Sequence, residues 1–308
     1  METGVLVIGS INHDSIYQVA ALPRPHETIP ASAFTTAPGG KGANQAAACA
    51  MATDRPVRML GAVGADLHAD VCLQYLETSG VDITQVLRAN DHPTGTACIL
   101  VEESGHNLIV VSAGANGALM PAHITGAEDL IAQSHILLLQ LETPMESVRA
   151  ALTASRELGK TSILNPAPYV SGVEELIPLV DMLTPNETEA SALTGIKVTD
   201  ADSAGLAAKA LLKMGAAEVV ITLGQHGYYI ATQTTAQHCP AYHVCDVVDT
   251  SGAGDVFNGA LAGALADGAG LLEAAQFASA SAALSVQKPT ASHCAPSKQQ
   301  ALEFMNSQ

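Results

Sequence analysis

The sequence is poor in positive charge and in aromatic residues. Its 308 residues include 13 Lys and Arg against 30 Asp and Glu, a formal net charge of −17, and aromatic residues make up 3% with no Trp. Nucleic acids and anionic membrane surfaces are bound mainly through Lys and Arg, so the charge argues against both as partners. If the ligand carries phosphate, backbone amides and metal ions must supply most of the positive field.

Several common motifs are also absent. The six cysteines form no C-x-x-C pair and the eleven histidines form no H-E-x-x-H pattern, which argues against a disulfide framework and a zinc site. Neither G-x-x-x-x-G-K-[ST] nor G-x-G-x-x-G occurs, so neither a P-loop nor a dinucleotide fold is predicted. No stretch reaches the ~20 apolar residues of a membrane span, and no basic leader precedes the first strand-like segment. We expect a cytoplasmic protein with free thiols.

The segments that are present alternate between strand and helix. Short, continuous apolar runs alternate with helical segments. Examples of the runs are residues 4–9 and 135–141, and examples of the helical segments are residues 66–79 and 201–214. This pattern predicts an α/β fold, with a mainly parallel central sheet covered by helices on both faces. Further predicted strands are 57–62, 161–164, 180–183 and 218–222, and further predicted helices are 256–266, 271–286 and 297–305.

Two segments interrupt this alternation. Residues 15–37 contain three prolines between short β-favouring pieces, and residues 94–111 read as a hairpin through a Glu-Glu-Ser-Gly turn at 102–105. We expect segments 13–37 and 94–112 to form a small separate sheet that acts as a lid, within a single domain of residues 1–308.

Polar side chains recur where the predicted strands end. Asn12, Glu142, Asn165, Asn186 and Thr222 each follow an apolar run. Any one of them is explained as a turn residue. In a parallel sheet, however, these strand ends meet at one edge, where ligands bind in α/β folds.

Residues 249–255 join a β-type run at 243–248 to the helix predicted at 256–266. The turn Gly252-Ala253-Gly254 would aim free amides, aided by the helix dipole, at an anion. Asp255 stands beside that turn, either as a helix N-cap or as a group that acts on the anion, and the local sequence leaves both open. Three glycines around Lys41 likewise fit a close ligand approach or a hinge that caps the helix running to about Thr53.

Together these motifs resemble the ribokinase-like (PfkB) family of sugar and nucleoside kinases over nearly the whole chain. The most specific pieces are residues 39–46 and 249–255, and residues 10–14, 165–168, 184–189 and 222–224 are also similar to family motifs. Residues 10–14 and 39–46 resemble the ribokinase branch in particular. The resemblance implies ATP-dependent phosphorylation of D-ribose at its 5-hydroxyl, giving D-ribose 5-phosphate and ADP.

The resemblance also implies roles for individual residues. Asp255 matches the catalytic base, and the amides of Gly252, Ala253 and Gly254 match an anion hole for the moving phosphoryl group. The positions that match sugar-binding residues are Asn12, Asp14, Gly40, Lys41, Gly42, Asn44 and Glu142, together with Asp255. The positions that match the nucleotide side are Asn186, Glu189, Thr222, Gly224, Gly227 and Gly254.

Two metal ions and a second subunit follow from the same resemblance. The spacing of Asn186 and Glu189 matches the family motif near Mg²⁺, an ion that prefers oxygen ligands and water. A monovalent cation, usually K⁺, is expected beside the anion hole, and the lid is expected to form a homodimer interface. The loop at 288–294 departs from the family because it lacks the usual glycine and has a thiol, a poor ligand for a hard cation. The matching cation positions are Asp249, Ser251, Ser285, Lys288, Thr290 and Cys294.

Other activities remain as alternatives. A related kinase could act on deoxyribose, another sugar or a nucleoside, although a nucleoside would need an apolar or aromatic pocket for which the 10 aromatic residues give no clear sign. A non-catalytic sugar-binding regulator is the alternative from another class. Asp255, Lys41 and the glycine turn together argue against it, because binding alone needs no base aimed at a phosphate.

Overall fold

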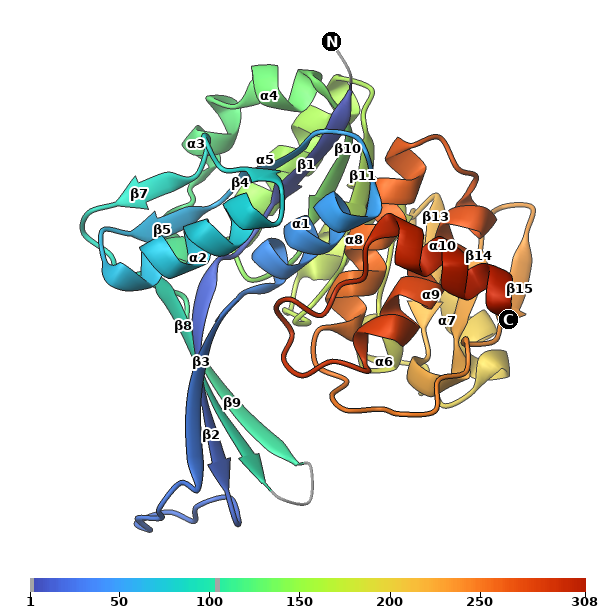
Figure 1. Cartoon of the computed structure of the whole chain (residues 1–308). Helices are drawn as coiled ribbons and strands as arrows, with labels where there is room; N and C mark the ends of the chain where they lie inside the picture. The colour runs from blue at the N-terminus through green and yellow to red at the C-terminus, as the bar shows by residue number, and fades with distance from the viewer. Residues whose placement is uncertain (1–2, 103–105) are drawn as a thin grey trace.

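The structure is a computed structural model that describes residues 3–102 and 106–308 (Figure 1). Within these residues a nine-stranded sheet forms the centre of the molecule. Its strands in spatial order are β15 (Ala236–Cys239), β14 (Tyr228–Ala231), β13 (Glu218–Thr222), β12 (Met182–Leu183), β11 (Thr161–Leu164), β10 (Ser134–Leu139), β1 (Gly4–Ile8), β4 (Val57–Leu60) and β6 (Val81–Asp82). All neighbours from β13 to β6 are parallel, which confirms the predicted mainly parallel α/β fold.

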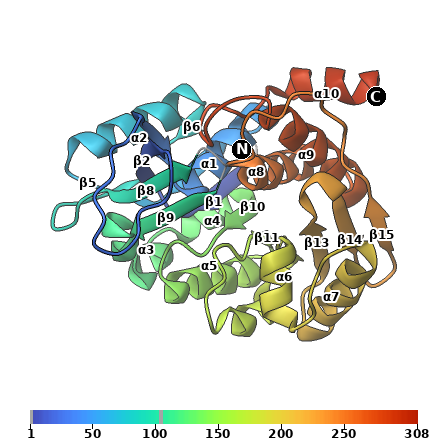
Figure 2. The same cartoon turned by 90° about the horizontal axis from the view of Figure 1, so that it is seen from below.

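Helices cover both faces of this sheet, as predicted. Val5 and Val7 of β1 pack into one core cluster while Leu6 and Ile8 pack into the other, because successive side chains of a strand point to opposite faces. One face carries α1 (Lys41–Ala52), α2 (Leu67–Thr78), α8 (Ala253–Ala266), α9 (Leu271–Ser285) and α10 (Lys298–Ser307) (Figure 2). The other carries α3 (Pro121–Thr125), α4 (Glu128–Ala132), α5 (Met145–Glu157), α6 (Glu187–Thr194), α7 (Ala201–Met214) and the 3₁₀ helix η2 (Val173–Leu179).

Small residues let α1 and α8 pack closely. A Cβ added at Gly259 of α8 would stand 2.4 Å from the carbonyl oxygen of Gln45 in α1, so a larger residue cannot occupy this position without a shift. The close packing brings the N-terminal turns of the two helices together, which is where the chemistry of the chain is predicted to lie.

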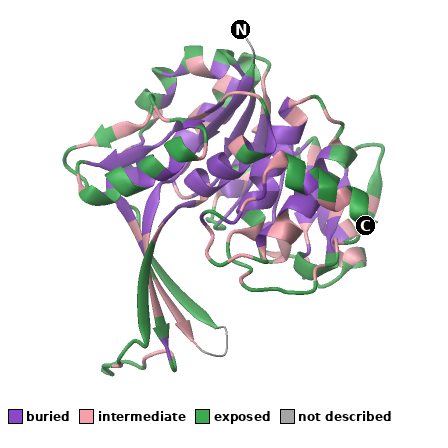
Figure 3. Ribbon diagram, in the orientation of Figure 1, coloured by how far each residue is buried: buried purple, intermediate pink, exposed green. Residues whose placement is uncertain are grey.

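The predicted lid is a separate four-stranded sheet that projects from the body (Figure 1). Much of it is exposed to solvent, and every residue of its outer strand β9 is exposed (Figure 3). The turn predicted at 102–105 lies, apart from Glu102, outside the described residues. The lid strands in order are β3 (Ala33–Gly39), β2 (Asn12–Val19), β8 (Gly95–Glu102) and β9 (Asn107–Ser112).

Three local predictions are corrected. The β-type run at 243–248 is wrong, because β15 ends at Cys239 and the chain from there to the start of α8 has no strand pairing; Val247 and Val248 are more than half exposed. The helix predicted at 256–266 begins at Ala253, three residues earlier than predicted. The strand predicted at 57–62 ends at Leu60, after which β5 (Ala62–Gly64) pairs with β7 (Leu87–Ala89) in a two-stranded sheet.

The helices of the described residues are each too short or too polar to cross a membrane.

Candidate active site

The polar residues predicted to cluster do meet at one edge of the central sheet. They follow the carboxyl ends of β1, β10, β11, β12 and β13. The chain leaves β1 through β2, β3 and α1 to reach β4 on one side, whereas β10 lies on the other side. Neighbouring connections thus run in opposite directions around β1, which is the arrangement that opens a ligand crevice in α/β sheets.

Asp255 lies near this edge, in the first turn of α8. Gly252 is the N-cap residue of the helix, with a left-handed φ of 77°, and Asp255 is the third helical residue. The buried carboxylate accepts hydrogen bonds from Nδ2 of Asn44 at 3.1 Å and from Nε2 of Gln45 at 3.0 Å. The capping interpretation of Asp255 is therefore wrong, since both of its oxygens bind side chains of another helix.

The charge of Asp255 is balanced mainly by Lys41, the first residue of α1. Burial raises the pKa of Asp255 above its ordinary value, against the influence of the Lys41 ammonium and of the Gln45 and Asn44 amides. The pKa of Lys41 is raised first by Asp255 and also by Glu142 and Glu189, although burial opposes this. Among the described residues no carboxylate oxygen lies within 4 Å of the Lys41 ammonium, so this cation can also attract a ligand anion.

Two of the three predicted anion-hole amides at the start of α8 are open to a ligand, whereas that of Ala253 donates to the Thr250 carbonyl at 3.3 Å. Those of Gly252 and Gly254 have no acceptor within the described part of the chain, and no side chain caps this end of the helix. A Cβ at Gly254 would meet no atom within 4 Å, so the space in front of that residue is open. Unpaired amides at a helix N-terminus with open space before them are suited to a phosphate oxygen.

On the other side of Lys41, Asp14 presents an unused acceptor. Its Oδ1 is buried without a hydrogen-bond partner in the described residues, and Oδ2 would lie 2.1 Å from a Cβ at Gly39. Burial, followed by the charges of Glu142 and Asp255, raises the pKa of Asp14 to about 7. A buried polar atom without a partner is costly, and a ligand hydroxyl would satisfy it.

The glycines around Lys41 allow α1 to start against the segment that follows β1. Gly40 has a φ of 89°, and its Cβ would lie 2.7 Å from the amide nitrogen of Asn12. A Cβ at Gly42 would lie 2.5 Å from the amide nitrogen of Ser10. This packing gives the glycines a use that was not predicted, the close approach of two backbone segments within the protein, and it tests neither ligand approach nor a hinge.

Glu142 links the two segments that meet there. Its Oε2 accepts hydrogen bonds from the Ser10 hydroxyl at 2.6 Å and from the Lys41 amide at 3.1 Å. Glu142 therefore helps to hold the start of α1 next to the predicted sugar-binding residues of β2.

The predicted nucleotide residues converge at the start of α6 and the end of β13. Asn186 and Glu189 form a capping box, in which the Glu189 amide donates to Asn186 Oδ1 and the Asn186 amide donates to Glu189 Oε2, both at 2.9 Å. Asn186 also bridges to Thr222. Gly224 and Gly227 flank the next turn with left-handed φ angles of 51° and 91°, in and after the 3₁₀ helix η3 (Gly224–His226).

Asp249 joins the two segments predicted to hold a monovalent cation. Its Oδ1 accepts a hydrogen bond from the Ser251 amide at 2.8 Å, and Oδ2 accepts one from the Thr290 amide at 3.1 Å. Thr290 has a φ of 68°, in the left-handed region that favours glycine. The loop thus makes a left-handed turn at Thr290 without a glycine.

The rest of the cation loop turns back on α9. The buried thiol of Cys294 donates to the Ala291 carbonyl at 3.0 Å. The Lys288 amide donates to the Ser285 carbonyl at 3.0 Å. The loop is therefore held by its own carbonyls, and the Cys294 thiol acts as a hydrogen-bond donor within it.

Comparison with known proteins identifies the family. The profile of the pfkB family carbohydrate kinases matches residues 2–298. The chain is 37% identical over 305 residues to the ribokinase of Haemophilus influenzae, with 99% of each chain covered. It is also 37% identical over 259 residues to the deoxyribokinase of Salmonella typhi, with 84% of each chain covered. The chain belongs to the pfkB carbohydrate kinase family.

The solved structures agree with this membership. The structure of Arabidopsis thaliana ribokinase complexed with ribose and ATP has a TM-score of 0.90 and 32% identity to the chain, and that of Thermotoga maritima ribokinase has a TM-score of 0.90 and 34% identity. Each match covers 99% of both chains. As a pfkB carbohydrate kinase the protein is a phosphotransferase that uses ATP and a carbohydrate.

Sequence reasoning missed several buried amides of this kinase site. The sequence gives no role to Gln45, although it lies within the motif 39–46, nor to Gln140, although it lies within the strand predicted at 135–141. Asn165 was predicted as a strand-end residue and as part of the motif 165–168, without a role of its own. Asn116, in the 3₁₀ helix η1 (Gly114–Ala118), donates to Oδ1 of Asn12 at 2.7 Å and carries no sequence signal of its own.

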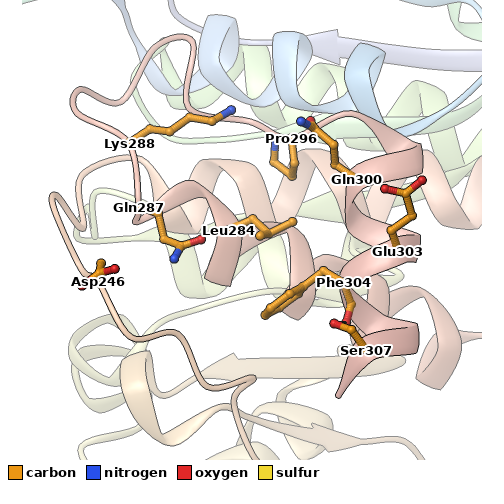
Figure 4. Close-up of a pocket in the computed structure, with 9 residues that line it drawn as sticks. All are labelled: Asp246, Leu284, Gln287, Lys288, Pro296, Gln300, Glu303, Phe304 and Ser307. Atoms are coloured by element: carbon orange, nitrogen blue, oxygen red, sulfur yellow. The ribbon is translucent and has the colours of Figure 1, made fainter.

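A separate pocket of about 690 Å³ lies between α9, α10 and the chain around Asp246 (Figure 4). Lys288, Gln300 and Glu303 line it with polar groups, and Phe304 supplies an apolar wall. Among the described residues Lys288 is the one predicted site residue in its lining, so this pocket is not the sugar or nucleotide site of the kinase.

Proposed function

We propose that the protein transfers the γ-phosphoryl group of ATP to the 5-hydroxyl of D-ribose, giving D-ribose 5-phosphate and ADP. The observation that carries this proposal is the buried Asp255 carboxylate set between open amides on one side and unpaired sugar-side acceptors on the other. The likeness to ribokinases over nearly the full chain supports the choice of ribose.

In the proposed reaction Asp255 takes the proton of the 5-hydroxyl as that oxygen attacks the γ-phosphorus. The bond from the γ-phosphorus to the bridging oxygen breaks, and ADP leaves. The amides of Gly252, Ala253 and Gly254, together with Lys41, hold the charge of the transferring group in a site that excludes water. Closure of the lid over the sugar would limit transfer to water.

Ribose would be held by Asn12, Asp14 and Glu142, with Asn44, Lys41 and the backbone of Gly40 and Gly42 around it. Asp14 Oδ1 offers a buried acceptor for a hydroxyl. ATP would lie across Asn186, Thr222, Gly224 and Gly227, with its phosphates toward Gly254. A ring of short donors and acceptors suits a substrate with adjacent hydroxyls.

Mg²⁺ fits this site only together with the nucleotide. In residues 3–102 and 106–308 no group of three or more His, Cys, Asp or Glu side chains is arranged to hold a metal ion. Asn186 and Glu189 would face the ion through water, while phosphate oxygens supply direct ligands. The bound ion would neutralise phosphate charge.

K⁺ fits the loop beside the anion hole through oxygen atoms. Asp249 and the carbonyls of Ser251, Ser285, Lys288 and Thr290 would provide them, and the Cys294 thiol would not. Replacing K⁺ by tetramethylammonium should lower kcat/KM, and an unchanged rate would reject the site.

A homodimer through the lid is proposed from its exposed apolar side chains. Phe34, Ile109, Val110 and Val111 are each at least half exposed, and they lie on one small sheet. A second copy of the chain is the proposed occupant. Analytical ultracentrifugation at micromolar concentration should show a dimer that Val110→Lys dissociates, and a monomeric wild type would contradict the proposal.

Deoxyribose is the second candidate substrate, because the Salmonella typhi deoxyribokinase is as similar in identity as the ribokinases. A coupled assay of ADP release with ribose, deoxyribose, fructose and nucleosides tests the choice. Ribose should give the highest kcat/KM. A higher value for deoxyribose would move the proposal to that sugar, and a higher value for a nucleoside would overturn it.

A further inference from the structure

Gln45 is a fully buried amide that contacts Asp255. Its Nε2 donates to Asp255 Oδ1 at 3.0 Å and to Asn165 Oδ1 at 3.1 Å, and its Oε1 accepts from Nε2 of Gln140 at 2.6 Å. Both amide hydrogens of Gln45 and its carbonyl are thus used inside the protein. None of these groups is left for a substrate.

The orientation of this amide is fixed by partners that cannot be reversed. Nδ2 of Asn165 donates to the main-chain carbonyl of Thr184 at 2.9 Å, so Asn165 must present Oδ1 to Gln45. The ionised carboxylate of Asp255 also only accepts. A reversed Gln45 would set its oxygen against two acceptors and its NH₂ against the NH₂ of Gln140, which in a buried network is strongly unfavourable.

The same network reaches the amide turn at the start of α8. The Thr184 hydroxyl donates to Oδ1 of Asn258 at 2.5 Å, and Nδ2 of Asn258 donates to the carbonyl of Gly254 at 2.8 Å. One chain of hydrogen bonds therefore connects the carboxylate of Asp255, through Gln45, with the backbone of Gly254.

We propose that Gln45 is a positioning residue, which fixes the carboxylate of Asp255 relative to the Gly252–Gly254 amides without contacting either substrate. The inference rests on the proposed role of Asp255 as base. Because a hydrogen bond to a carboxylate favours its ionised form, removing the Gln45 donor raises the pKa of Asp255. The other titratable groups that interact with Asp255 are Lys41, Glu142, Asp14, Glu189, Tyr75 and Cys294, and the substitutions below leave them in place.

Two substitutions by residues of about the same size as glutamine test whether Gln45 positions Asp255 or only fills space. Gln45→Glu keeps the shape and replaces a donor to Asp255 by a second acidic group, and Gln45→Met keeps the length and removes the donor. Both should lower kcat about 10- to 100-fold with little change in KM for the sugar, and should move the acidic limb of the kcat/KM–pH profile up by about 1 to 2 pH units. Gln45→Glu should move it further, because two adjacent carboxylates resist joint ionisation.

Ser162→Ala is the matched control. The buried Ser162 hydroxyl donates to Asp181 at 2.8 Å at the opposite end of β11 from Asn165, so its loss costs stability without touching the network. Ser162→Ala should lower Tm and leave the acidic limb of the kcat/KM–pH profile unchanged. A Gln45→Glu enzyme with the wild-type limb and kcat, or an equal shift in Ser162→Ala, would overturn the inference.

Asp255→Asn, assayed alongside, separates this inference from the proposed function. If Asp255→Asn is inactive and the Gln45 variants behave as wild type, the positioning role fails and the base assignment stands. If Asp255→Asn retains wild-type turnover, the base assignment itself is wrong, and the role of Gln45 falls with it.

Discussion

Asn116 donates a 2.7 Å hydrogen bond from Nδ2 to Oδ1 of Asn12, a residue 104 positions earlier in the chain. Its own orientation is fixed by the backbone, because Asn116 Oδ1 accepts from the Ile11 amide at 2.8 Å and Nδ2 donates to the Ile11 carbonyl at 3.2 Å. Asn12 therefore has its oxygen engaged, which leaves its NH₂ group as the donor for a ligand. Under the proposed function, the sugar would meet a donor at Asn12 and an acceptor at Asp14.

Asn116→Asp should turn the side-chain amide of Asn12 around, so that its NH₂ group faces residue 116. An aspartate there would repel Oδ1 of Asn12 and draw its NH₂ away from the sugar. KM for the sugar should rise by about tenfold or more, the effect of losing one hydrogen bond in a site that excludes water, while KM for ATP stays the same. Steady-state kinetics with each substrate varied in turn measures this, and an unchanged sugar KM would contradict the assigned orientation.

Asp255→Asn should lower kcat by about 10²- to 10⁴-fold, the usual contribution of a positioned base. Asparagine fills the same volume, so the fold and the binding of sugar should persist. Isothermal titration with ribose and a coupled ADP assay check the two halves of this prediction. Loss of sugar binding together with activity would indicate a structural role for the carboxylate.

Asp14 should make the sugar-free enzyme less stable as pH rises. Its pKa is raised from 3.8 to about 7, so the folded protein holds this proton more tightly than the unfolded chain. Its favourable contribution is complete below pH 3.8 and is lost as pH rises to 7. Asp14→Asn should therefore gain Tm relative to wild type by ~2 °C or more between pH 5 and pH 8.

The same substitution should weaken sugar binding, since asparagine can turn a donor toward the hydroxyl. Differential scanning calorimetry at several pH values follows the stability. A Tm difference independent of pH would show that the carboxyl is not the group responsible.

Gly252 and Gly254 should respond in opposite ways to alanine. At Gly252 the φ of 77° and a Cβ position 2.8 Å from Ala291 Cα predict a loss of about 1–2 kcal/mol of stability. At Gly254 the space is open and the backbone is helical, so alanine should keep or raise stability. The added methyl group should still lower kcat/KM for ATP by about tenfold, since it fills the space before the amides. Chemical denaturation and ATP kinetics of the two variants test the contrast, and equal behaviour would contradict it.

The elements were largely predictable because strand and helix patterns are local. The continuous apolar runs of β1 and β10 and the glycine and proline boundaries of α2 and α5 are visible in the sequence. The run at 243–248 was mispredicted because two valines favour a strand only if a neighbour exists to pair with, and here both are exposed. The early start of α8 was missed because Ser-Gly-Ala-Gly favours a turn, whereas the left-handed Gly252 permits the helix to begin at once.

The site was predictable as a set of residues and less so as a set of contacts. Asp255 and Lys41 stand in recognisable glycine motifs. Gln45 lies in one of these motifs, but nothing in the sequence shows that it contacts Asp255, 210 residues away. Asn116 stands in no such motif, and it contacts Asn12, 104 residues earlier. A single sequence does not show which side-chain amides form hydrogen bonds with one another.

The lid and the sugar-side residues share the same backbone. Asn12 pairs with Gly39 in β3 and with Gly95 in β8, and Gly40 and Lys41 follow directly. Under the proposed function, Asn12 and Asp14 would hold the sugar and also form the base of the lid sheet. A protein bound to the exposed end of the lid would then act on the sugar directly, through the strands that carry these residues.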